Sequence, residues 1–245
     1  MTDDYAYLTR HRQVWARKAV LRRIYSEQFY APLLAYRGPR TLEIGSGPGL
    51  LEGIAPGVIR TDILPSPYIH VAADAHHLPF ADGTLDSVIG LDVLHHFDTP
   101  VRVLRELARV LRPGGAVALV EPWITPFSRF VYTYLHQEHC DLRVEPWRDT
   151  SQFEVGADKA AFDGNAAIPF RLVQQLARDA SVLPELPLER CEPFCLFTYL
   201  LSFGFKRASL LPAMAYPFAY HLERVTRPLW QRPAALRALL VWRKP

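Results

Sequence analysis

The feature that most constrains the fold is a short apolar run followed by three glycines at alternate positions. Residues 40–51 read R-T-L-E-I-G-S-G-P-G-L-L, which predicts a strand over 41–44, a turn built on Gly45, Gly47 and Gly49, and then a helix. Glycine suits such a turn because it adopts unusual backbone angles and lets a ligand approach the main chain. The helix start would offer unpaired N–H groups to a polar or anionic ligand. An ordinary strand-to-helix turn could carry the same glycines, so the loop alone identifies no ligand.

Short apolar segments recur after this loop and alternate with helical patterns. Such alternation is typical of a parallel sheet with helices on both faces, whose ligands bind beyond the carboxyl ends of the strands. Only a dozen residues separate Gly49 from Asp62, and Pro56-Gly57 interrupts them, so the first core helix must be short. The predicted strands are 41–44, 58–62, 69–72, 85–91 and 116–121, with closing strands at 187–191 and 236–243.

Several motifs follow the glycine loop in a fixed order. They are Asp62, Asp74-Ala75 before Leu78-Pro79-Phe80, the strand 86–91, His95-His96, and Leu111-Arg112-Pro113-Gly114-Gly115. Through this order the chain resembles the class I S-adenosylmethionine-dependent methyltransferases, in particular the small-molecule branch typified by quinone-biosynthesis methylases. The resemblance covers roughly residues 38–122. It implies a Rossmann-like, doubly wound α/β fold with a mostly parallel seven-stranded sheet.

The resemblance also implies S-adenosyl-L-methionine as cofactor and a role for each motif. Asp62 would accept hydrogen bonds from the ribose hydroxyls, since a carboxylate takes two donors well. Asp74 would accept the adenine amino group, with the Ala75 N–H facing a ring nitrogen. Glu43 would orient the loop or the amino group. The remaining cofactor-binding residues are Gly45, Gly47 and Gly49, beside the methionine and ribose portions, and Gly90 and Leu91, near the methionine carboxylate and the sulfonium.

His95 and His96 follow the fourth predicted strand, close to where the methyl group would leave. Methyl transfer is an in-line attack on an activated carbon, so the enzyme mainly positions and desolvates the nucleophile. A general base helps when an alcohol or phenol must lose a proton, and histidine suits that task at neutral pH. His95 and His96 are therefore the predicted catalytic residues. The alternative is a structural pair, with one histidine capping the next helix.

The flanking segments are predicted to cover the acceptor. Residues 1–37 form an N-terminal helical cap, 38–122 the cofactor-binding core, and 123–245 an aromatic-rich, substrate-covering insertion with closing strands of the same domain. The cap has a basic face, which is either a solvated helix surface or a lid that meets an acidic substrate. The predicted substrate contacts are Arg12, Trp15, Glu121, Trp123 and His136.

Composition limits the class of partner. The net charge of +3 over 245 residues is too small to argue for nucleic acid. Three cysteines indicate no disulfide framework, and the acidic start without an apolar core is unlike a signal peptide, so a cytoplasmic protein is expected. No His and Cys spacing matches a zinc pattern, and no metal is predicted. Apolar stretches at 200–205 and 210–216 form either extra core or, with Arg224, Arg227 and Arg232, a patch for peripheral membrane contact.

The resemblance implies methyl transfer, and the apolar stretches favour a small, apolar or lipid-linked acceptor. An alternative is a methyltransferase-like binding or regulatory module that has lost its chemistry, which the sequence leaves open because the reaction needs no obligatory catalytic residue. A nicotinamide or nucleotide-sugar enzyme is a third hypothesis. The G-x-G-x-G spacing and the Asp74-Ala75 segment speak against it.

Overall fold

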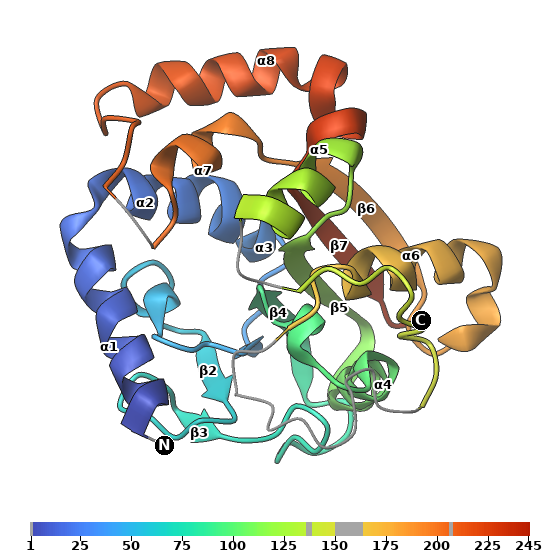
Figure 1. Cartoon of the computed structure of the whole chain (residues 1–245). Helices are drawn as coiled ribbons and strands as arrows, with labels where there is room; N and C mark the ends of the chain where they lie inside the picture. The colour runs from blue at the N-terminus through green and yellow to red at the C-terminus, as the bar shows by residue number, and fades with distance from the viewer. Residues whose placement is uncertain (1, 136–138, 150–163, 206–207) are drawn as a thin grey trace.

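The computed structural model describes residues 2–135, 139–149, 164–205 and 208–245, and it contains a seven-stranded sheet in the order β3-β2-β1-β4-β5-β7-β6 (Figure 1). β7 runs antiparallel to both of its neighbours, β5 and β6, whereas the pairings among β1 to β5 are parallel. The predicted Rossmann-like fold is confirmed. The strands are β1 (Thr41–Ile44), β2 (Ile59–Asp62), β3 (Val71–Ala72), β4 (Leu85–Leu91), β5 (Leu111–Pro122), β6 (Leu188–Phe194) and β7 (Arg237–Arg243).

Helices lie on both faces of the sheet (Figure 1). One face is covered by the N-terminal helices and two later ones: α1 (Thr2–Arg17), α2 (Ala19–Ile24), the π-helix η1 (Tyr25–Tyr30), α3 (Ala31–Leu34), α7 (Phe197–Ser202) and α8 (Tyr216–Ala234). The opposite face carries α4 (Pro100–Val110) and α6 (Ile168–Arg178). Shorter elements are η2 (Leu50–Gly53), η3 (Leu94–His96), α5 (Pro126–Phe130), η4 (Val131–Leu135) and η5 (Ala180–Val182).

Each face of the sheet has its own apolar core, because the central strands are apolar on both sides. Val88 and Leu119 face α4 and α6, whereas Ile89 and Val120 face η1 and α3. Trp242 of β7 is fully buried in the first of these cores. Burial of β1, of most of β4 and of β5 from Gly115 onward fixes their register and hence the positions of their carboxyl ends.

The predicted elements are mostly correct, with four main differences, one of which is that β6 ends at Phe194, three residues later than predicted. A single 3₁₀ turn, η2, follows the glycine loop where a short helix was expected, because Pro56-Gly57 leaves no room for a second turn. The third strand, β3, has only two residues. β5 starts at Leu111, five residues earlier than predicted, and joins α4 without a loop. Among the described helices, none is long and apolar enough to cross a membrane.

Candidate cofactor and acceptor site

The three glycines of the loop have positive φ angles but different surroundings. A Cβ atom at Gly45 would lie 2.3 Å from Cγ2 of Val93, and one at Gly49 would lie 2.7 Å from the carbonyl oxygen of Tyr68. At Gly47 the nearest atom to a Cβ would be Cδ2 of Leu8, 3.9 Å away on α1. Gly45 and Gly49 are therefore required by packing, whereas Gly47 faces open space beneath α1.

Asp62 ties the glycine loop to the end of β2. Its Oδ2 accepts the Gly47 N–H at 2.8 Å, and its Oδ1 accepts the Leu64 N–H at 2.9 Å. The Ser46 N–H donates to the Thr61 carbonyl at 3.0 Å, so loop and strand are joined twice. Each carboxylate oxygen can accept a further donor beyond these bonds. The carboxylate predicted for the ribose thus also shapes the loop.

Glu43, the buried acidic residue of β1, lies behind the loop and is only 2% exposed. The Ser46 hydroxyl donates to its Oε2 at 2.7 Å, and the Tyr30 hydroxyl also hydrogen-bonds to it. Burial raises the pKa of Glu43 from 4.5 to about 7, although the hydrogen bonds and the Arg60 charge pull it down. Glu43 therefore orients the loop from the protein interior. Tyr30 was not predicted to lie there, because its place depends on the packing of η1 against β1.

Replacing Glu43 by glutamine should make stability less dependent on pH. Between pH 4.5 and about 7 the folded state keeps the proton that the unfolded state releases, so the wild type loses stability as the pH rises. Glutamine cannot ionise. We therefore expect Glu43→Gln to raise the free energy of unfolding by about 2–3 kcal/mol at pH 8 and by much less at pH 5. Urea unfolding of the ligand-free protein at both pH values measures this. An equal change at both would contradict the assignment.

Asp74 and Ala75 follow β3, the strand next to β2. Oδ1 of Asp74 accepts the backbone N–H of His76 at 2.9 Å and lies 2.7 Å from its Nδ1. Burial acts to raise the pKa of Asp74, but these hydrogen bonds outweigh it and lower the pKa. The side chain is 47% exposed, whereas Ala75 is buried. Asp74 is thus an accessible carboxylate just after β3, and its contact with adenine stays a prediction.

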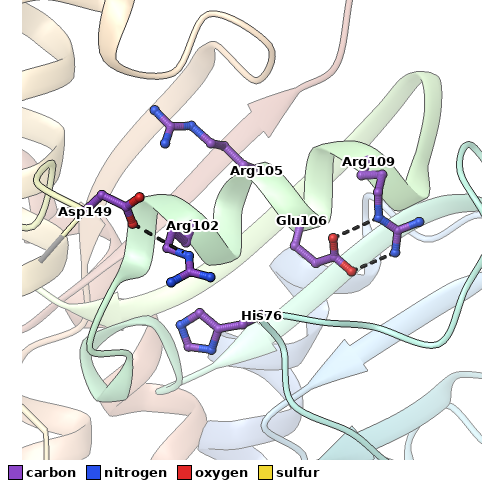
Figure 2. A pocket seen from close by; sticks show the side chains of 6 residues that line it. All are labelled: His76, Arg102, Arg105, Glu106, Arg109 and Asp149. Carbon is purple, nitrogen blue, oxygen red and sulfur yellow. Dashed lines mark hydrogen bonds and ion pairs between the residues drawn. The ribbon is translucent and has the colours of Figure 1, made fainter. Parts of the chain in front are cut away.

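A shallow depression of about 360 Å³ lies beside this segment, over α4 (Figure 2). Its basic residues have acidic partners: Arg102 lies 3.6 Å from Asp149, and Arg109 lies 2.7 Å from Glu106. Figure 2 shows Arg105 pointing away from His76, and its own partner, Glu185, lies outside the depression at 3.2 Å. Because these charges are already matched, the depression offers little to an anionic ligand.

His95 and Glu121 form a buried pair where β4 and β5 end. Both side chains are fully buried, and Nδ1 of His95 lies 2.7 Å from Oε2 of Glu121. The other carboxylate oxygen accepts the backbone N–H groups of Val93 and Leu94 at 2.9 and 2.8 Å. Glu121 thus holds the turn after β4. Its complete burial favours a positioning role over the predicted substrate contact.

His96 is the more accessible member of the histidine pair. It is half-buried, and its ring centroid lies 4.1 Å from that of His95. Gly164 packs against both rings, since a Cβ there would lie 2.7 Å from Nδ1 of His96. The next residue, Asn165, donates its N–H to the His95 carbonyl at 2.9 Å. Gly164 and Asn165 could not be predicted from the sequence, because nearly seventy residues separate them from the histidines that they contact.

Gly90, Leu91 and Asp92 complete the edge of the sheet. A Cβ at Gly90 would lie 2.7 Å from Cγ1 of Val93, so no side chain fits there. Asp92 has a φ of 55°, which is unusual for a residue other than glycine. Its carboxylate forms an ion pair with Arg237 at the start of β7. Backbone strain and a charged partner at a strand end are typical of functional sites.

Arg237 was missed by sequence reasoning, although a charged residue opening an apolar strand was a usable signal. It is 5% exposed, and its guanidinium lies 5.4 Å from the ring centroid of Phe29 and 5.0 Å from that of Tyr199. Burial lowers the pKa of Arg237 to about 10. The guanidinium is paired with Asp92 and packed against aromatic faces, an arrangement that lessens the cost of burying its charge.

The N-terminal cap lies over the glycine loop. Arg12 donates to the Pro48 carbonyl at 2.8 Å and its guanidinium lies 4.2 Å from the ring centroid of Tyr68. The Tyr5 hydroxyl donates to the Pro65 carbonyl at 2.6 Å, so α1 spans from the loop to the segment after β2. Trp15 packs edge-on against Tyr25, with ring centroids 5.7 Å apart. Arg12 is thus near the predicted cofactor site but bound to the loop itself.

The remaining predicted contacts are spread over the insertion. Trp123 follows β5 and packs edge-on against Phe170 of α6, with ring centroids 5.0 Å apart. His136 lies outside the described residues. Within the described ranges, no three His, Cys, Asp or Glu side chains are grouped so that they could hold a metal ion. Cys140, Cys191 and Cys195 are free thiols.

Comparisons with known proteins find a related domain and several relatives. Residues 42–119 match the family described as "Methyltransferase domain". Methyltransferase GfsG of Streptomyces halstedii is 30% identical over 138 residues, which are 48% of this chain and 50% of that protein. The 27-O-demethylrifamycin SV methyltransferase of Amycolatopsis mediterranei is 46% identical over 54 residues, 22% of this chain and 20% of that protein. The matches thus span half or less of these relatives.

Solved structures share the fold over more of the chain. A S-adenosylmethionine-dependent methyltransferase of Thermotoga maritima superposes with a TM-score of 0.54 at 15% identity and covers 100% of both chains. Another from Archaeoglobus fulgidus has a TM-score of 0.52 at 14% identity, covering 91% of this chain and 94% of that one. Residues 42–119 thus match the methyltransferase domain family, and the chain shares the fold of these two solved structures.

Proposed function

We propose that this protein transfers a methyl group from S-adenosylmethionine to a small, apolar or lipid-linked acceptor. The observation that carries the proposal is the convergence of three features on one edge of the sheet. A Cβ atom at Gly47 would meet nothing nearer than 3.9 Å, Asp62 accepts the Gly47 N–H, and the His95–His96 pair follows β4. Ligands of open α/β sheets bind at this edge.

The residues present fit the cofactor. Asp62 can accept the ribose hydroxyls in addition to its two backbone donors, and Asp74 offers an exposed carboxylate one strand further along. The missing side chain at Gly47 leaves space where the cofactor would pass close to the main chain. When bound, S-adenosylmethionine would supply a methyl group activated by the adjacent sulfonium.

The two histidines have different roles in the proposed reaction. His95 is fully buried and held by Glu121, so it positions the turn and its neighbour. His96 is half-buried and is the better candidate to take a proton from an acceptor hydroxyl. Gly164 limits where the His96 ring can lie. The chain thus fixes the imidazole of His96 after the end of β4. There it could accept the proton of an acceptor with an acidic hydroxyl.

Aromatic side chains near this edge favour an apolar acceptor. Tyr199 of α7 and Trp123, which follows β5, are half-buried, whereas Phe29 of η1 is fully buried beside Tyr199. One relative, the Amycolatopsis protein, is named as a methyltransferase of 27-O-demethylrifamycin SV, which supports a small-molecule acceptor. We expect phenols, quinones and lipid-linked acids to be the first acceptor classes to react.

Transfer of a labelled methyl group tests the proposal. The protein is incubated with methyl-labelled S-adenosylmethionine and each acceptor class, and the label is followed into the extracted product. We expect product with at least one class, and a marked loss of kcat in His96→Gln with less change in KM. Cofactor binding without protein-dependent transfer to any class would instead support the silent binding module.

A further inference from the structure

The outward face of α8 carries an apolar stripe. Phe218, Leu222, Val225 and Leu229 have exposed fractions of 73%, 42%, 58% and 81%. Their spacing of four, three and four residues places them on one side of the helix, over a length of about 16 Å at 1.5 Å per residue. Figure 1 shows α8 as the outermost helix of its face, with α7 between it and the N-terminal helices.

The inward face of α8 is firmly bound to the protein. Tyr216 is buried, and Glu223 accepts the backbone N–H groups of Leu196 and Thr198 at 3.1 and 2.8 Å. Arg227 lies 2.7 Å from Glu192 and donates to the Pro193 carbonyl at 2.6 Å. Because the polar contacts of α8 lie on this side, the apolar stripe is the face that α8 presents away from the protein.

The charges exposed on α8 have one sign. Arg224 and Arg232 are exposed, as is His221, whereas Glu223, the one acidic residue of this helix, is 3% exposed. An apolar stripe with cationic side chains beside it and no accessible carboxylate complements an anionic lipid surface. A second copy of the same face would place arginines against arginines, which opposes self-pairing.

Exposed apolar side chains continue from α8 onto neighbouring segments. Leu210 and Met214, just before α8, are 67% and 94% exposed. α5 contacts α8, and its Phe130 is 52% exposed. Tyr134 of η4, which follows α5 directly, is 72% exposed. α5 begins four residues after β5 ends, so Phe130 and Tyr134 come soon after the carboxyl end of that strand.

We propose that the outward face of α8 binds the surface of a membrane that contains anionic lipids. The helix would lie in the plane of the interface, with its apolar stripe among the acyl chains and Arg224 and Arg232 at the level of the headgroups. This docking does not depend on methyl transfer. It would bring an acceptor dissolved in the membrane to the edge of the sheet.

Vesicle sedimentation tests the proposal. The full chain is mixed with vesicles of phosphatidylcholine alone or with 30% phosphatidylglycerol, and the bound fraction is measured at low and high salt. We expect binding to be about tenfold stronger to the anionic vesicles and to weaken with salt. The triple variant Phe218→Ser, Leu222→Gln, Leu229→Gln should bind at least about tenfold more weakly, with an unchanged unfolding curve.

Matched controls distinguish the loss of the apolar stripe from the loss of any exposed aliphatic side chain or any change of charge. Ile63→Gln removes another exposed aliphatic side chain, 61% exposed at the end of β2, and should leave binding unchanged. Arg232→Glu should weaken binding to anionic vesicles more than Arg178→Glu, which makes the same charge change on α6. Equal binding by the triple variant and the wild type overturns the proposal. So does sedimentation of the wild type as a dimer that the triple variant loses, without any vesicle binding.

Discussion

Glu121→Ala should lower the free energy of unfolding by about 3–5 kcal/mol, because it leaves several buried donors unpaired at once. The carboxylate accepts from the Val93 and Leu94 backbone N–H groups and pairs with Nδ1 of His95, and neither Glu121 nor His95 is exposed. The alanine cavity offers no replacement acceptor. Urea unfolding monitored by tryptophan fluorescence measures the loss. A change below about 1 kcal/mol would contradict the buried network.

Glu121→Gln distinguishes the effect of the hydrogen bonds from that of packing, because glutamine has nearly the same volume as glutamate. Its amide oxygen can still accept the two backbone N–H groups, but its NH₂ group then faces Nδ1 of His95. The imidazole must accept at that nitrogen and carry its proton on the other. We expect a smaller loss of stability and a change of His95 tautomer visible in nitrogen-15 spectra. An unchanged tautomer would show that Glu121 does not set it.

Gly47→Val should weaken S-adenosylmethionine binding by about a hundredfold or more while the fold persists. Its Cβ would meet no atom nearer than 3.9 Å, so the first carbon of the side chain causes no clash within the protein. The positive φ adds strain of about 1–3 kcal/mol. Because the added methyl groups enter the space beneath α1, they should displace the cofactor. Calorimetric titration of the folded variant measures the loss.

Gly114→Val is the matched control for this backbone strain. Gly114 also has a positive φ, and a Cβ there would meet nothing within 4 Å. It lies near the start of β5, away from the carboxyl edge of the sheet. Both variants should therefore lose similar stability, and only Gly47→Val should lose cofactor affinity. Normal binding by Gly47→Val would mean that the glycine loop does not cradle the cofactor.

The strands and the glycine loop could be predicted because local signals specify them. β4 has the predicted bounds, 85–91, since Val88 and Ile89 bury apolar side chains on both faces of the sheet, between two layers of helices. The helix after Gly49 could not be predicted as a single 3₁₀ turn, although Pro56-Gly57 indicated that it would be short. Small differences in where a turn ends depend on packing that local sequence does not contain.

The candidate site was only partly predictable, because its remaining members are distant in sequence. Nothing near Asp92 indicates that Arg237 pairs with it, and nothing near His96 indicates that Gly164 packs against its ring. His95 and His96 look equivalent in the sequence, yet the turn of η3 buries the first completely and leaves the second half-exposed. Burial and long-range pairing are properties of the fold, so they required the structure.

Calorimetric titration of the purified protein with S-adenosylmethionine, and separately with S-adenosylhomocysteine and NAD, tests the central claim most directly. We expect micromolar binding of the first two and none of NAD, because the loop has the G-x-G-x-G spacing and Asp62 accepts the Gly47 N–H. If neither S-adenosyl compound binds a folded sample free of carried-over ligand, the glycine loop is not a cofactor site and the account is wrong.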